Sequence, residues 1–196
     1  MPTETVETTQ LSLYDMRMVS GKPGSRISRL CGTTYRSLRN WEMGTPVPNI
    51  VNVHDLLQIY GYSFYQLDLS LFYATRPDQN ERQSKINGVA QKPIPVSHPP
   101  KSLSLYDMRK AARISGATVA AICGVSYRTL RNWETGSSIP NVINVYELLQ
   151  IYGYSFYELN LIPFYTVLEE RSKKQKEMDE LIDNPLRERR RFTENR

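Results

Sequence analysis

Residues 122–134 read ICGVSYRTLRNWE, and residues 30–42 read LCGTTYRSLRNWE. In each stretch an apolar segment stops at a Gly, a Ser or Thr follows, and eight residues rich in hydrogen-bonding side chains come next. Gly is favoured just beyond the end of a helix, and Ser or Thr just before the start of one. A short Gly-containing turn between two helices is typical of the helix-turn-helix motif. Both stretches therefore predict two short helices joined by a tight turn.

The two stretches belong to a longer internal repeat. Residues 11–73 align with residues 103–165 at an offset of 92 without a gap, and 36 of these 63 positions are identical. Only two copies at so long an offset do not make a solenoid, so we interpret them as two homologous small domains. We call residues 11–73 the first repeat and residues 103–165 the second repeat. The apolar spacing in each repeat is helical and predicts five short helices.

Three further segments complete the predicted organisation. We expect a flexible amino terminus over 1–10, a Pro-rich linker without a core over 74–102, and a charged helical tail over 166–196. A flexible linker of 29 residues has a root-mean-square span of about 30 Å. The predicted fold class is therefore all-α: two five-helix domains, a Pro-rich linker and a charged C-terminal helix.

Composition excludes several classes of protein. Two Cys exclude a disulfide framework and a four-cysteine zinc site, and two His leave little for a metal cluster. The sequence holds no paired His/Cys or Ser/His/Asp arrangement, so we expect no catalytic residue, no cofactor and no metal. No apolar run approaches the roughly 20 residues that cross a bilayer, and the acidic amino terminus is unlike a secretory signal. We therefore expect a cytoplasmic protein without membrane contact. The net charge of +5 is compatible with a nucleic-acid partner.

A spaced pattern in each repeat resembles one known family. A small residue precedes the turn Gly by four positions, and the following helix ends in Trp, then Glu-x-Gly, and later Pro. The second repeat shows this pattern as Ala120, Gly124, Trp133, Glu134, Gly136 and Pro140, and the first as Ser28, Gly32, Trp41, Glu42, Gly44 and Pro48. The pattern resembles the lambda-repressor-like (Cro/cI-type, XRE) helix-turn-helix domains, and the resemblance covers both repeats.

The resemblance also implies an ion pair within each repeat. An Arg on the first helix commonly pairs with the Glu that ends the third helix in this family. Here these residues are Arg17 with Glu42 and Arg109 with Glu134, both 25 residues apart. The alternative is that each pair consists of two independent surface charges.

The resemblance places the third helix of each repeat in the major groove of DNA. Arg can donate two hydrogen bonds to guanine, and Asn can form two with adenine. We expect base contacts from the outward side chains of this helix, namely Tyr35, Arg36, Arg39, Asn40, Tyr127, Arg128, Arg131 and Asn132. We expect phosphate contacts from Ser25, Arg26, Arg29, Thr34, Thr118 and Ser126. The alternative is a solvated amphipathic helix whose Arg side chains merely face water.

The tandem arrangement predicts a covalent pseudo-dimer that reads two similar half-sites on double-stranded DNA. The linker span is close to the 34–36 Å between half-sites one helical turn apart. A flexible tether leaves inverted and direct repeats both open. We expect a transcriptional regulator, most simply a repressor, of bacterial, plasmid or phage origin. The alternative function is a protein-interaction module, antitoxin-like or for assembly, that binds a polypeptide. Self-association through the aromatic fifth-helix region or the C-terminal tail is also open.

Overall fold

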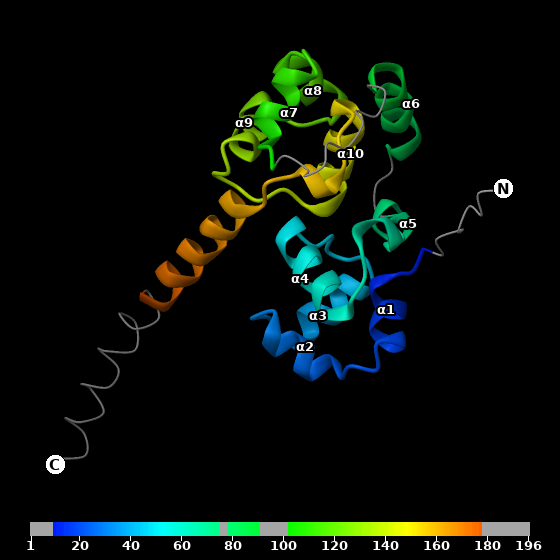
Figure 1. The fold of residues 1–196 in the computed structure, drawn as a ribbon, viewed down its shortest axis with the longest axis vertical. Helices are drawn as coiled ribbons and strands as arrows, with labels where there is room; N and C mark the ends of the chain where they lie inside the picture. Colours follow the sequence, from blue (N-terminus) through cyan, green and yellow to red (C-terminus); the bar gives the residue numbers. More distant parts are fainter. Residues whose placement is uncertain (1–9, 75–77, 91–101, 178–196) are drawn as a thin grey trace, which may run out of the picture.

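The computed structural model describes residues 10–74, 78–90 and 102–177, and these residues are helical apart from loops and isolated β-bridges. Figure 1 shows two helical units. The first unit contains α1 (Leu13–Val19), α2 (Gly24–Leu30), α3 (Tyr35–Glu42), α4 (Ile50–Tyr60), the 3-10 helix η1 (Phe64–Gln66) and α5 (Ser70–Tyr73). The second unit contains α7 (Leu105–Ala111), α8 (Gly116–Ile122), α9 (Tyr127–Glu134), α10 (Val142–Tyr152) and the 3-10 helix η2 (Phe156–Glu158). The all-α fold class is confirmed.

The elements from α1 to η1 have the same bounds as those from α7 to η2 once the offset of 92 is applied. The first four helices of each repeat are present as expected. The expected fifth helix is only a three-residue 3-10 helix, η1 or η2. The first residue of each, Phe64 or Phe156, is buried, while the second, Tyr65 or Tyr157, is half exposed.

Local sequence sets the ends of the helix that follows each turn. The hydroxyl oxygen of Thr34 accepts a hydrogen bond from the Ser37 amide at 3.0 Å, and that of Ser126 accepts one from the Thr129 amide at 3.0 Å. These N-caps satisfy amides that the first helical turn leaves without an intrahelical partner. The apolar side chains of α3 and α9, such as Leu38 and Leu130, are fully buried. Capping and burial together fix where the exposed face of each helix points.

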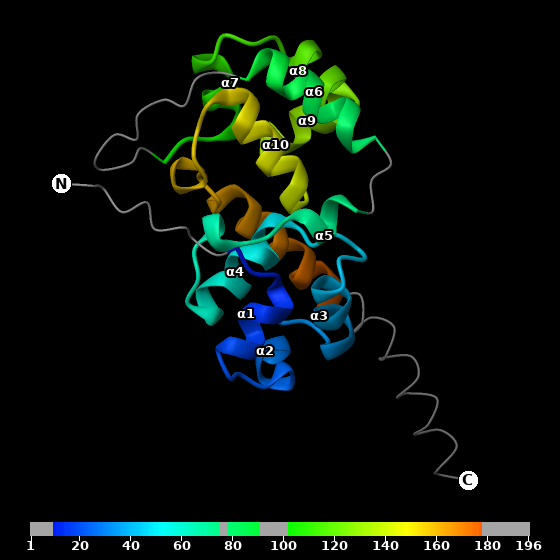
Figure 2. The ribbon, with the colours of Figure 1, turned by 90° about the vertical axis from the view of Figure 1, so that its right-hand side faces the viewer.

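The segment between the repeats is partly ordered against the second repeat. Helix α6 (Gln79–Val89) packs against α8 and α10, and Ile86 is 1% exposed. Figures 1 and 2 both show α6 beside α10. The expectation of a linker without a core is wrong here. A single buried Ile among polar residues gives no periodic apolar pattern, so the sequence carried no helix signal of this kind. The rest of that linker, 75–77 and 91–101, lies outside the described residues.

The tail is helical over 162–177, and residues 178–196 lie outside the described residues, as do residues 1–9 of the expected amino-terminal arm. This helix begins before the expected domain boundary at residue 166. None of the helices within the described ranges is long and apolar enough to span a membrane.

Backbone hydrogen bonds join the two units reciprocally. The Ile50 amide donates to the Pro140 carbonyl at 3.1 Å, and the Val142 amide donates to the Pro48 carbonyl at 3.1 Å. The two bonds are related by the offset of 92, which takes Pro48 to Pro140 and Ile50 to Val142. Such self-complementary contacts define an isologous interface, which has twofold symmetry.

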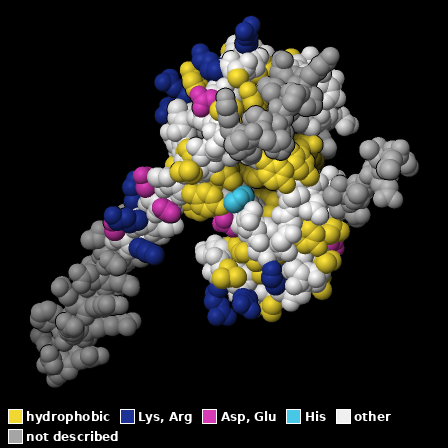
Figure 3. All heavy atoms as spheres, viewed as in Figure 1, with side chains coloured by type: hydrophobic (Ala, Val, Ile, Leu, Met, Phe, Trp, Pro, Cys, Tyr) yellow, Lys and Arg dark blue, Asp and Glu magenta, His cyan; other side chains and the backbone are white. Residues whose placement is uncertain are grey.

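Aromatic side chains continue the same interface. Phe64 stacks on Phe156 with ring centroids 4.4 Å apart, and Tyr65 lies 5.4 Å from Tyr157. Again each contact joins equivalent positions. Figure 3 shows apolar side chains gathered over this junction, with Lys and Arg mostly away from it. Direct packing, and not the linker alone, therefore sets how the two units are oriented.

Candidate nucleic-acid interface

The two helices expected to contact bases lie on one side of the molecule. Figure 2 shows α9 in the upper half and α3 in the lower half, both to the right of α7 and α1. The isologous interface lies between them. A ligand with two equivalent binding positions can therefore approach both helices from the same side.

The outward faces of α3 and α9 are open to solvent. Tyr35, Arg36 and Arg39 are exposed and Asn40 is half-buried. The equivalent residues of the second repeat have the same exposure: Tyr127, Arg128 and Arg131 are exposed and Asn132 is half-buried. Within the described ranges, no protein segment covers these faces.

The tyrosine at the start of each of these helices also has a packing role. The ring of Tyr35 lies against Gly24, and a Cβ at Gly24 would overlap it. The ring of Tyr127 lies against Gly116 in the same way. Each ring therefore joins α3 or α9 to the start of the preceding helix, while Tyr35 remains 47% exposed. The sequence contained a signal for this pairing, since the Gly and the Tyr are identical in both repeats.

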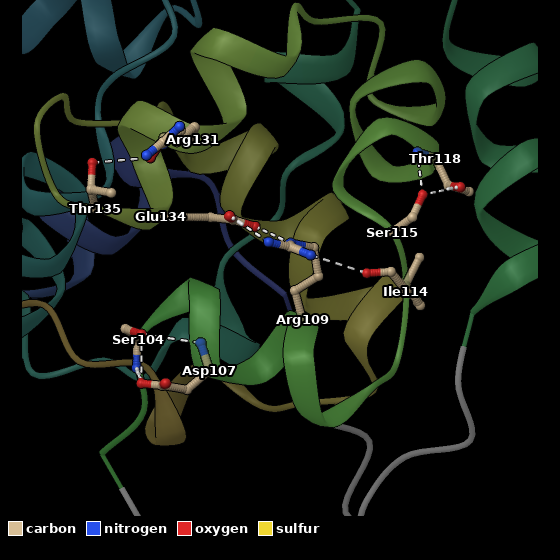
Figure 4. A network of polar contacts seen from close by, with 9 residues as sticks. All are labelled: Ser104, Asp107, Arg109, Ile114, Ser115, Thr118, Arg131, Glu134 and Thr135. Carbon is tan, nitrogen blue, oxygen red and sulfur yellow. Dashed lines mark hydrogen bonds and ion pairs between the residues drawn. The ribbon is translucent and has the colours of Figure 1, made fainter.

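The ion pair that the resemblance implies is present in each repeat. Arg109 binds Glu134 in a bidentate manner through Nε and through Nη2, the latter at 2.9 Å from Oε2, and it donates from Nη1 to the Ile114 carbonyl at 3.1 Å. Figure 4 shows Arg109 between these two partners. The hydrogen bond to Glu134 raises the pKa of Arg109 above its ordinary value. The pair thus ties α7 to the end of α9.

The corresponding pair in the first repeat is slightly more exposed. Arg17 Nε lies 2.5 Å from Glu42 Oε1, and Arg17 Nη2 lies 3.1 Å from Oε2. The Arg17 side chain is 12% exposed, compared with 8% for that of Arg109. The two pairs thus join α3 to α1 and α9 to α7.

The residues expected to contact phosphate fall into two groups. The hydroxyls of Thr34 and Ser126 cap helices, and the Thr118 hydroxyl lies 2.7 Å from that of Ser115. Ser25, Arg26 and Arg29 instead lie exposed on α2. At the two equivalent positions of the second repeat, Thr118 replaces Arg26 and Ala121 replaces Arg29. The first repeat therefore carries two additional cations on α2, the helix that packs against α3.

This difference predicts that the two repeats contribute unequally to the salt dependence of duplex binding. Each phosphate contact from Arg contributes about −0.9 to the slope of log K against log salt concentration. Replacing Arg26 and Arg29 with Ala should make the slope for duplex binding less steep by about 1.8 units. Titrating a duplex at several salt concentrations measures the slope. The matched second-repeat variant, Thr118→Arg with Ala121→Arg, should steepen it; a slope unchanged by both variants would remove α2 and α8 from the interface.

Sequence reasoning missed two groups of residues that help to position α3 and α9. The backbone of Pro48 and Pro140 pairs the repeats, and Arg82 from α6 lies at the turn before α9. The Pro residues had a signal in their identity between repeats, whereas Arg82 had none.

Comparison with known proteins gives one family. Residues 105–159 match the family model described as Helix-turn-helix (HTH_3), which covers α7 through η2. Neither the curated proteins nor the solved structures include a significant match to the chain. Residues 105–159 are therefore similar to helix-turn-helix domains, and the turn between α8 and α9 agrees with this similarity.

Proposed function

We propose that this chain is a sequence-specific double-stranded DNA-binding protein that acts as a covalent pseudo-dimer. Helices α3 and α9 enter the major groove at two half-sites, and the chain regulates transcription there. Arg36 and Asn40, with Arg128 and Asn132, make the base contacts. The observation that carries the proposal is the reciprocal packing of the repeats, which leaves both reading faces open on one side.

The symmetry of the interface gives the half-sites an orientation. An isologous contact relates two units by a twofold axis, and such a protein matches a duplex site with the same symmetry. The two half-sites are therefore inverted repeats, centred about one helical turn apart at about 34–36 Å. Direct repeats would require the second unit to turn around and would break the bonds at Pro48 and Pro140.

The two reading faces favour nearly identical half-sites. All four outward residues of α3 are identical in α9, and Ser37 in place of Thr129 is the nearest difference. A repressor of bacterial, plasmid or phage origin is the simplest role, because steric occlusion of a promoter needs no activating or ligand-binding domain.

Selection of bound duplexes from a random pool tests the proposal. We expect an enriched inverted repeat with two similar half-sites spaced by about one helical turn. Enrichment of a direct repeat would contradict the fixed orientation. A pool without enrichment, together with binding that hardly changes with salt, would favour the protein-interaction alternative.

A further inference from the structure

We infer that Arg82, in the segment between the repeats, is a positioning residue for α9, the helix that we propose reads bases in the second repeat. This inference rests on the proposed function for its DNA readout, but its structural part stands independently. Arg82 belongs to α6, which follows the first repeat yet packs on the second. The helix therefore acts from outside the helix-turn-helix domain that it contacts.

The position of Arg82 is specific. Its guanidinium lies against Gly124, the Gly of the turn between α8 and α9, and a Cβ at Gly124 would overlap Nη2. Gly124 has φ of 58°, a left-handed conformation that favours Gly on its own. The turn thus needs Gly for its backbone conformation, and the missing Cβ also leaves the space that the Arg82 guanidinium occupies.

A buried carboxylate holds Arg82 in place. Arg82 Nη1 lies 3.7 Å from Oε2 of Glu147 on α10, whose side chain is 2% exposed. Ile86, one turn further along α6, is 1% exposed and anchors the same face of the helix. A fixed cation therefore joins α6 and α10 to the turn that precedes α9, and it restricts how that turn can move.

The first repeat lacks this device. Lys174 lies 92 positions after Arg82, beyond the aligned repeats, and it is exposed on the helix over 162–177. Gly32, the equivalent of Gly124, has no atom within 4 Å of the position where a Cβ would lie. Instead a pocket of about 560 Å³ separates that turn from the C-terminal helix, lined in part by Gly32, Thr33 and Lys173.

The two repeats therefore divide their roles. The turn of the second repeat is held in place before DNA binds, so less conformational entropy is lost there on binding. The turn of the first repeat has no such contact at Gly32, but this repeat carries the additional cations Arg26 and Arg29. The second repeat is thus the pre-ordered reading unit, and the first contributes more through the phosphate backbone.

Amide hydrogen exchange of the full chain tests the positioning role without DNA. In Arg82→Gln, we expect the amides of Gly124 and Val125 to exchange about tenfold faster or more, because local opening of the turn becomes easier. Peptides that cover Gly32 and Thr33 should keep their rates. Lys85→Gln is the matched control, since Lys85 lies on the same helix and pairs only with the exposed Glu81 in the described part of the chain.

Unchanged exchange at Gly124 in Arg82→Gln, or equal acceleration at both turns, would overturn the inference. If far-UV circular dichroism shows that Arg82→Gln does not fold, Arg82→Lys decides, because Lys keeps a charge near Glu147 but lacks the guanidinium that reaches the turn. It should raise exchange at Gly124 selectively; exchange as slow as in the parent chain would overturn the inference.

A selected duplex adds the functional readout. Arg82→Gln should weaken binding about tenfold, since the second turn must then be ordered on binding. If amide exchange at Gly124 becomes faster but the affinity for DNA does not change, only the role of Arg82 in DNA reading is overturned. If the parent chain binds no duplex, the proposed function fails, while the exchange result still decides whether Arg82 positions the turn.

Discussion

Replacing Arg128 and Asn132 together with Ala should abolish the sequence preference of the second repeat. Each bidentate contact to a base contributes about 1–3 kcal/mol of discrimination, so the two changes remove about 2–6 kcal/mol. This corresponds to a loss of affinity for the selected site between about 30-fold and about 20,000-fold. Gel-shift titration against selected and scrambled duplexes measures the loss.

Folding should survive these two changes, because Arg128 is exposed and Asn132 is half-buried. Lys110→Ala is a suitable control, since it removes an exposed cation from α7 rather than from the reading face. It should lower binding to both duplexes equally and only slightly. A double variant that prefers the selected duplex as strongly as the parent chain does would show that α9 does not read bases, because α3 alone should give only a weaker preference.

Replacing Glu134 with Ala should destabilise the second repeat more than any surface change. The substitution leaves the Arg109 guanidinium buried without its carboxylate, and loss of one partner from a buried pair costs about 3–5 kcal/mol. Arg109 as a residue is only 7% exposed, so water cannot replace the missing partner fully. Urea denaturation followed by circular dichroism gives the free energy of unfolding.

Two comparisons separate this effect from a general loss of charge. Glu42→Ala should cost somewhat less, because the Arg17 side chain is more accessible than that of Arg109. Glu81→Ala removes one partner of an exposed pair with Lys85 and should leave the unfolding transition unchanged. Equal stability of Glu134→Ala and the parent chain would mean that the pair does not brace α9 against α7.

Much of each repeat follows from local signals in the sequence. Ser126 before Tyr127 and Gly124 at the turn gave the start of α9, and Glu134 before Gly136 gave its end. Caps and turn glycines act over a few residues, so a single sequence is enough to place them. The outward face of α9 follows from the same helix, since burial of Leu130 and Trp133 orients it.

The arrangement of the repeats does not follow from such signals. The contacts between Phe64 and Phe156 and between Ile50 and Pro140 join residues about 90 apart, and nothing in either repeat specifies its partner. Helix α6 was missed for a related reason. Its stability comes from packing Ile86 on another unit and from Arg82 beside Glu147, both of which are tertiary effects.

The stoichiometry of the complex tests the central claim most directly. A duplex that carries one inverted pair of half-sites is titrated with the purified chain, and sedimentation velocity gives the mass of the complex. One chain per duplex is expected, because a single molecule supplies both reading helices across its internal twofold axis. A saturated complex with two chains on that duplex would contradict the account, since each half-site would then be read by a separate molecule.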